Sequence, residues 1–283
     1  MISFLDRLVH MLPNLPSKMA AAAKFSLDNP DYIAMNSMRA AAKKSGVTST
    51  TMLRLARLME FKSYTEFKQA FQENIIRDSF GDRAKQLQNT TGSSDIKPVL
   101  QSITDAAIKN LNDTLNSYDP EVLHQMAKVL LSARTPYVIG VGSMHSLAEL
   151  MQFTGRMTLP GLRVPRMGEA TVFETLGAIR EDDAILALTV SPYAKNSADA
   201  LKFAKDRGAT VMVITDKRSS PMLKYADLHL LTTTNSPHYY PSFIAVIAVI
   251  EALLAAVVIE GGDEILDQIA MIDGIRDDSG VYI

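Results

Sequence analysis

The stretch Pro136–Ala148 constrains the fold of this chain more than any other part of it. It joins a short apolar segment, Tyr137–Val141, to a turn containing Gly140 and Gly142, and then to residues that favour a helix. A strand that ends at glycine and runs into a helix leaves backbone N–H groups free at the helix N-terminus, an arrangement that binds anions and phosphate in particular. The stretch therefore predicts an α/β domain with a candidate anion site at this turn.

The same strand–turn–helix pattern recurs further along the chain. Apolar strand-like segments alternate with helical ones in this order: strands Ala184–Val190, Thr210–Thr215 and Asp227–Thr232, and helices Leu147–Met157, Asn196–Arg207, Pro221–Tyr225 and Phe243–Glu260. Such alternation predicts a mainly parallel sheet that is covered by helices on both faces. Ligands bind beyond the C-terminal ends of the strands in such sheets, so the candidate ligand loops are Gly140–Ser146, Thr189–Asn196 and Thr215–Ser220.

The first 78 residues show helical periodicity and a basic balance of charge. Residues 1–77 contain 11 Lys and Arg against 6 Asp and Glu, whereas the remainder contains 18 basic against 25 acidic residues. Leu100–Leu115 and Glu121–Ser132 are expected as two further helices, after a polar linker at 79–98 that contains Gly92. A basic helical head on an acidic body indicates that only the head meets a polyanion.

Within the head, Ser37–Ser45 and Thr50–Glu60 are two short helices separated by a tight turn at Gly46, which is the helix-turn-helix pattern. Met52 and Leu55 supply a buried face, and polar residues occupy the opposite face of the second helix, as a recognition helix requires. A solvated helix face is the alternative interpretation of its arginines. The candidate DNA contacts are Lys43, Lys44, Thr48, Ser49, Thr50, Thr51, Arg54, Arg57, Lys62 and Tyr64, the last through its hydroxyl.

Composition excludes several other classes of site. The chain has no cysteine, and its five histidines are scattered, so neither a disulfide framework nor a metal site is expected. The start of the sequence lacks the basic and apolar regions of a signal peptide, which favours a cytoplasmic location. The longest apolar run, Phe243–Ile259, is interrupted by Glu251 and is expected as a buried core helix rather than a membrane span.

The segment Ala40–Lys68 resembles the N-terminal helix-turn-helix of the RpiR family of bacterial transcriptional regulators. The matching residues are Ala41, Gly46, Val47, Thr51, Arg54, Ala56, Leu58, Phe61, Phe67 and Lys68. Three departures are Thr48 for a serine, Glu60 for a glycine, and Ser63-Tyr64 for Gly-Phe. The resemblance implies a helix-turn-helix domain at 1–78 and, after the linker at 79–98, a sensor domain at 99–283.

The segment Thr189–Leu231 is similar to the sugar isomerase (SIS) domain, which is the sensor of phosphorylated sugars in RpiR proteins. The similarity implies a three-layer α/β/α domain whose pocket holds phosphate with hydroxyls and backbone N–H groups. Pro192, Ala194 and Met144 stand where the family has glycine, threonine and serine, so the phosphate site is incomplete by this pattern. The candidate ligand residues are Gly142, Ser143, His145, Ser146, Thr189, Ser191, Tyr193, Lys195 and Asn196.

These features together predict a bacterial DNA-binding regulator, a homodimer or homotetramer that binds a double-stranded DNA operator. A small anionic metabolite, a phosphorylated sugar or sugar acid, is expected to control it, with no cofactor, no metal, no membrane partner and no enzymatic activity. Two alternatives stay open. One is an isomerase or lyase of sugar phosphates, for which His145, Glu169 and His238 are the candidate bases. The other is a DNA-binding architectural protein with a degenerate sensor.

Overall fold

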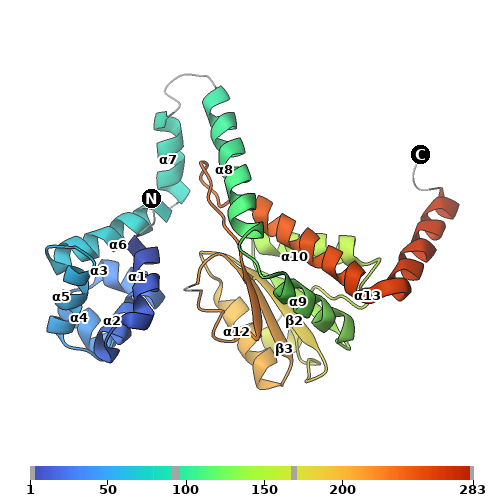
Figure 1. Cartoon of the computed structure of the whole chain (residues 1–283), viewed down its shortest axis with the longest axis horizontal. Coiled ribbons are helices and arrows are strands. Elements are labelled where there is room, and N and C mark those ends of the chain that lie inside the picture. The colour runs from blue at the N-terminus through green and yellow to red at the C-terminus, as the bar shows by residue number, and fades with distance from the viewer. Residues whose placement is uncertain (1–3, 79, 91–95, 167–170, 219, 281–283) are drawn as a thin grey trace. The chain divides into compact units, whose positions relative to one another are not determined.

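The structure is a computed structural model that describes residues 4–78, 80–90, 96–166, 171–218 and 220–280 (Figure 1). The chain divides into two compact units. The first runs up to Ile103 and also includes Ser236–Tyr240, and the second comprises Thr104–Asn235 together with the chain from Pro241 onwards. We call the first unit the head and the second the sensor.

All regular secondary structure among the described residues of the head is helical. Its elements are α1 (Phe4–Met11), the short 3-10 helix η1 (Leu12–Asn14), α2 (Ser17–Asp28), α3 (Pro30–Met35), α4 (Met38–Lys44), α5 (Ser49–Leu58), α6 (Tyr64–Asp78) and α7 (Phe80–Thr90). They enclose a core in which Leu8, Ile33, Met52, Phe67 and Phe71 are fully buried. Helix α7 and the start of α8 (Lys97–Leu115) fall within residues 79–98, where the sequence suggests a linker; the domain boundaries themselves stay a prediction.

The sensor is built on a four-stranded sheet. Its strands are β1 (Pro136–Gly140), β2 (Ala184–Thr189), β3 (Thr210–Thr215) and β4 (Leu228–Leu231), in the order β1-β2-β3-β4. Every neighbouring pair is parallel, and Gly140 lies beside Leu188 in the register of the first pair. The predicted parallel sheet is therefore confirmed, and the C-terminal ends of its strands share one edge.

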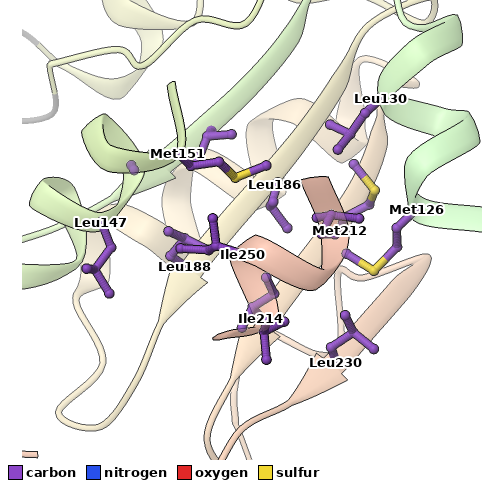
Figure 2. Close-up of a cluster of buried hydrophobic side chains, with 14 of the residues drawn as sticks. Met126, Leu130, Leu147, Met151, Leu186, Leu188, Met212, Ile214, Leu230 and Ile250 are labelled. Atoms are coloured by element: carbon purple, nitrogen blue, oxygen red, sulfur yellow. The ribbon is translucent and has the colours of Figure 1, made fainter. Parts of the chain in front are cut away.

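Helices cover both faces of this sheet (Figure 1). On one face, α9 (Pro120–Ser132), α10 (Ser143–Gly155) and α13 (Ile244–Ser279) pack on side chains such as Leu186, Met212 and Ile214 (Figure 2). On the other face, α12 (Lys195–Asp206) lies over Ile139, Ile185 and Val213, and α11 (Val172–Thr175) contacts α12. Successive residues of each strand point to opposite faces, so alternating apolar residues fill both layers and give the predicted three-layer arrangement.

Two expected elements differ from those observed. Pro221–Tyr225 forms consecutive turns rather than a helix, and it buries Met222 against the α12 face of the sheet. Helix α13 runs on to Ser279, with a kink at Gly262, where φ is 57° and ψ is −146°. By length and composition alone α13 could cross a membrane, but its first half supplies core residues such as Val249 and Leu253, as expected of a buried core helix.

Candidate DNA interface and effector site

The two helices of the predicted helix-turn-helix are joined by a compact turn with a defined hydrogen-bond pattern. Gly46 has a φ of +70°, its N–H donates to the carbonyl of Lys43, and the N–H of Val47 donates to the carbonyl of Ala42. This is a Schellman motif, in which glycine at the left-handed position closes the helix end. Thr48 then caps α5 by accepting a hydrogen bond from the N–H of Thr51 at 3.2 Å.

Helix α5 divides into a buried and an exposed face. Met52, Leu55 and Ala56 are fully buried in the head core. Thr50, Arg54 and Arg57 are exposed, and so are Lys43, Lys44, Thr48 and Lys62, while Ser49 and Thr51 are half-buried. Nine of the ten candidate DNA contacts are thus exposed or half-buried. Lys44 also lies over the ring of Tyr32, 4.2 Å from its centroid.

Tyr64 is the candidate contact that the structure does not support. Its side chain belongs to the head core with 7% exposure, and its hydroxyl is buried with no hydrogen-bond partner among the described residues. Burial raises the pKa of Tyr64 to about 12, and Tyr32 adds to the effect. A hydroxyl in this position cannot reach a phosphate, because α6 begins at Tyr64 and turns its side chain inward.

Glu60 stands where the RpiR pattern has glycine. It closes the end of α5 with the same motif by which Gly46 closes the end of α4. Glu60 has a φ of +70°, its N–H donates to the carbonyl of Arg57, and the N–H of Phe61 donates to that of Ala56. Arg7 in α1 donates to the Glu60 carboxylate at 2.8 Å and to the carbonyl of Met59 at 3.2 Å. The turn therefore keeps its shape with a non-glycine residue in the left-handed region, which L-residues disfavour.

In the sensor, the candidate ligand residues gather at the C-terminal edge of the sheet in two groups. Gly142 precedes α10, and Ser143, His145 and Ser146 lie in the first turn of that helix, directly after β1. The second group follows the neighbouring strand β2: Thr189, Ser191, Tyr193, Lys195 and Asn196. Neither α10 nor α12 begins with a side-chain cap, and the positive dipole ends of both helices lie at this edge. The N–H groups of Met144, His145 and Ser197 donate to the carbonyls of Val141, Gly142 and Ala194.

The two groups belong to connections that leave the sheet toward opposite faces. Helix α10 follows β1 onto one face of the sheet, whereas α12 follows β2 onto the other face. In parallel sheets a ligand binds where successive connections leave toward opposite faces, outside the carboxyl ends of the strands. Gly140 makes the turn into α10 tight: a Cβ atom there would lie 2.3 Å from the carbonyl oxygen of Met144.

The loop after β2 is held by a carboxylate that the sequence alone does not single out. The Tyr193 hydroxyl donates to Oδ1 of Asp216 at 2.7 Å, and the N–H of Ser191 donates to Oδ2 at 3.2 Å. Burial, reinforced by the Asp216 carboxylate, raises the pKa of Tyr193 well above its ordinary value, so the phenol stays protonated. Asp216 directly follows β3, and its place after a parallel strand is the signal that could have identified it.

Among the described residues, no hydrogen bond or ion pair joins the other predicted ligand residues His145, Lys195 and Thr189 to one another. His145 is half-buried, with Nδ1 lacking a partner among the described residues and Nε2 3.5 Å from Glu149. Lys195 is exposed and donates to Asp199 at 2.5 Å. Thr189 is buried at the end of β2. Glu169, one of the candidate bases, lies outside the described residues.

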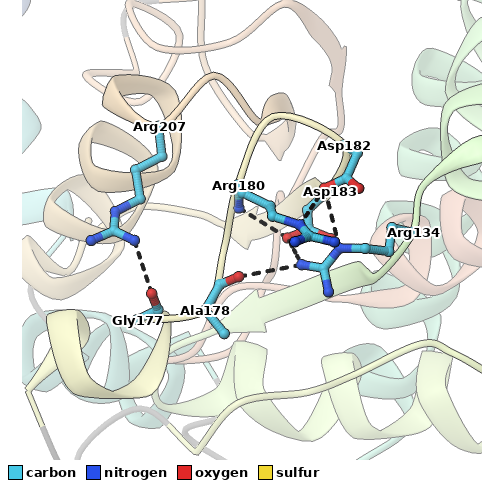
Figure 3. Close-up of polar contacts among 7 residues, drawn as sticks. All are labelled: Arg134, Gly177, Ala178, Arg180, Asp182, Asp183 and Arg207. Atoms are coloured by element: carbon cyan, nitrogen blue, oxygen red, sulfur yellow. Dashed lines mark hydrogen bonds and ion pairs between the residues drawn. The ribbon is translucent and has the colours of Figure 1, made fainter.

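A charged cluster lies at the opposite edge, where β1 and β2 begin (Figure 3). Asp183 is buried beside Arg134, whose guanidinium donates to it at 2.5 Å, and Asp183 also accepts from the N–H of Arg180 at 3.0 Å. Hydrogen bonding to Asp183 raises the pKa of Arg134. Asp183 therefore fixes the start of β2, and the cluster lies at the edge of the sheet opposite to the ligand loops.

Comparison with known proteins places both units in context. The family model of the SIS domain matches residues 129–259. An uncharacterized HTH-type transcriptional regulator of Haemophilus influenzae is 26% identical over 228 residues, which cover 80% of this chain and 78% of that protein. A second such regulator, from Clostridium perfringens, is 24% identical over 221 residues, covering 75% of this chain and 74% of its own length.

Two solved structures are also similar. The sugar isomerase domain of an RpiR transcription factor from Sphaerobacter thermophilus is 28% identical, with a TM-score of 0.58, and the match covers 63% of this chain and 99% of that one. The NanR protein of Vibrio vulnificus, complexed with ManNAc-6P, is 17% identical with a TM-score of 0.60. That match covers 96% of this chain and 97% of the other, and it supports the two-part fold.

Proposed function

Since the chain belongs to the RpiR family of HTH-type transcriptional regulators, we propose that it binds an operator through α5 and releases or tightens that binding when a sugar phosphate occupies the sensor. The observation that carries this proposal is the pairing of a capped, basic, exposed helix in one unit with a parallel-sheet ligand edge in the other. We further propose that it acts in the cytoplasm as a homodimer or homotetramer, because a twofold assembly presents two heads to a palindromic operator.

The head offers the two kinds of contact that sequence recognition requires. Thr50 and Arg54 lie on the exposed face of α5, from which side chains reach base edges in the major groove. Lys43, Lys44 and Lys62 flank that helix and are placed to neutralise phosphates, which positions the head without reading sequence. Thr48 is engaged as the helix cap, so it contributes to the orientation of α5 in addition to any DNA contact.

The sensor supports an anionic effector through backbone groups more than through side chains. The first turns of α10 and α12 bring positive helix-dipole ends to the same sheet edge. At the loop after β2, Pro192 has no N–H to offer and the N–H of Ser191 is bonded to Asp216. In the α10 turn the N–H groups of Met144 and His145 donate to the carbonyls of Val141 and Gly142 at 3.3 and 3.0 Å. We assign the phosphate to this turn, Gly142–His145, because each of its residues has an N–H, whereas the loop after β2 lacks one at Pro192. ManNAc-6P, found with the NanR protein of Vibrio vulnificus, is a member of the proposed ligand class.

Binding to DNA selected from a random duplex library tests the first part of the proposal. We expect the purified chain to enrich a palindromic sequence. Arg54→Ala should weaken binding to it and relax its specificity, because the lost contact is to a base edge. Lys62→Ala should weaken binding to all duplexes alike and lower the slope of log affinity against log salt by about 1. Arg156→Ala, in the sensor, is the matched control; an equal loss there, or no enriched sequence, would contradict the proposal.

A further inference from the structure

Helix α8 buries polar residues where a helix ordinarily buries apolar ones. Its only fully buried side chains are Asn110 and Thr114, with exposures of 0% and 1%, and α8 lies entirely within the described residues. Ile108 and Leu115 on the same helix are instead exposed. Asn110 and Thr114 are one turn apart and so share one face of the helix. Burying polar groups is unfavourable unless they are hydrogen-bonded, so this face is specific to its partner.

That partner is the segment that leaves β4. Thr233 contributes most of the contact: its N–H donates to the Thr114 hydroxyl at 2.9 Å and its own hydroxyl donates to the carbonyl of Asn110 at 3.0 Å. The Asn110 amide donates to the carbonyl of Asn235 at 2.7 Å. The Tyr118 hydroxyl, just beyond α8, donates to the carbonyl of Leu231 at 2.7 Å. Three hydrogen bonds to α8 and one to Tyr118, all across more than 110 residues of sequence, thus hold this segment in place.

The same segment is bonded on its other side to a candidate ligand loop. The N–H of Thr232 donates to the carbonyl of Thr215 at the end of β3, at 2.8 Å. The Thr215 hydroxyl donates to Ser220 at 2.9 Å, and the next residue, Asp216, accepts from Tyr193 in the loop after β2. Hydrogen bonds therefore connect Tyr193 to Asp216, Thr215 to Thr232, and Thr233 to α8, and the peptide chain joins these steps at 215–216 and 232–233. The whole path lies within the sensor.

We propose that Thr233, with its partners Asn110 and Thr114, is the coupling contact through which the effector site controls the position of α8. The inference rests on the proposed function for its biological meaning. Helix α8 is continuous across the boundary between the two units, which falls between Ile103 and Thr104. Because the buried groups lose their partners if the segment and the helix move apart, a shift of the strand-end loops requires α8 to follow. These residues position the helix and do not touch the effector.

Amide hydrogen exchange on the full chain, without effector, tests the coupling. The perturbation is Tyr193→Phe, which removes the hydrogen bond to Asp216 at the far end of the path. We expect exchange of the α8 amides at residues 104–115 to rise several-fold, although the Tyr193 hydroxyl donates to Asp216 and not to α8. A Thr233→Val background lacks the hydroxyl bonds to Asn110 and Thr114 but keeps the N–H bond to Thr114, so the same change should have a smaller effect on these amides. Thr154→Val is the matched control, because that hydroxyl bonds only within α10.

The inference is overturned if Tyr193→Phe leaves the α8 amides unchanged, or if its effect is the same with and without Thr233. A purely structural role for Thr233 would raise exchange in α8 but would leave the effect of Tyr193→Phe intact. DNA affinity of wild type and Thr233→Val, measured on the duplex enriched by selection, is a separate readout. Absence of any DNA binding by the wild type would defeat the proposed function, while the exchange result would still decide the coupling.

Discussion

Glu60 offers a sharp test of how the helix-turn-helix holds its shape. The residue sits at the left-handed position that closes α5, with φ at +70°, and its carboxylate pairs with Arg7. Two effects of opposite sign therefore meet at one residue. The backbone conformation is unfavourable for any residue with a Cβ atom, and the ion pair ties α1 to the turn. Replacement by glycine and by alanine separates the two effects, because both remove the ion pair but only glycine relieves the backbone.

The magnitudes follow from the geometry. A left-handed conformation costs a non-glycine residue roughly 1–2 kcal/mol, and the larger flexibility of glycine in the unfolded chain returns part of that gain. The side chains of Arg7 and Glu60 are 42% and 77% exposed, so their ion pair contributes only about 0.2–1 kcal/mol. We therefore expect Glu60→Ala to destabilise the head slightly, and Glu60→Gly to be more stable than Glu60→Ala by about 1 kcal/mol.

Thermal unfolding of the full chain, followed by circular dichroism at 222 nm, measures the difference. For a unit of the size of the head, 1 kcal/mol corresponds to a shift of about 4–8 °C in Tm. Arg7→Ala removes the ion pair together with the hydrogen bond to the carbonyl of Met59, so it should destabilise the head at least as much as Glu60→Ala. If the alanine variant is as stable as the glycine variant, Glu60 does not hold a strained left-handed turn, and the argument from the Schellman motif is wrong.

Other sites give further tests. Gly140→Ala should abolish the turn into α10 and the ligand-dependent shift in Tm, because the new Cβ would meet the backbone of Met144. Gly161→Ala is the control: its new Cβ would lie 3.8 Å from the nearest atom, so the ligand-dependent shift should remain. Tyr64→Phe should stabilise the head by about 1 kcal/mol, since the lost hydroxyl is buried without a partner, whereas Tyr118→Phe should destabilise the sensor by a similar amount. The pKa of Tyr64 is about 12 in the folded head and 10 in the unfolded chain, so ionisation of the phenol favours unfolding between these pH values. The free energy of unfolding, measured by urea titration, should therefore fall less between pH 10 and 12 for Tyr64→Phe than for the wild type.

The parts of the fold set by local pattern could be predicted closely from the sequence. Strand β3 has the predicted bounds, because an apolar run between two turns has one local solution. The segment Pro221–Tyr225 could not be predicted in this way. A helix of five residues gains too few hydrogen bonds to offset the unfavourable nucleation of its first turn, and consecutive turns already bury Met222. The glycines at 261 and 262 predict the end of the last helix, but the chain kinks at Gly262 and continues as a helix to Ser279.

The candidate sites show the same division between local and long-range information. The exposed and buried faces of α5 follow from its periodicity, and the two strand-end groups follow from the rule for parallel sheets. Asp216, by contrast, becomes part of the site only through partners 23 and 25 residues away. Asp183 is buried beside an arginine 49 residues distant, and Tyr64 is turned inward by the packing of α6. Such pairings depend on tertiary structure and leave no mark on the local sequence.

The most direct test of the account is a DNA-binding titration in the presence of sugar phosphates. Fluorescence anisotropy of the enriched duplex would be measured against protein concentration with hexose 6-phosphates, N-acetylmannosamine 6-phosphate and the unphosphorylated sugars. The account predicts that at least one phosphorylated compound changes DNA affinity by roughly 5- to 150-fold, the usual range of allosteric coupling, and that its unphosphorylated counterpart does not. Equal effects of both members of each pair, or no change with any compound despite tight sequence-specific binding, would contradict a phosphate-dependent sensor.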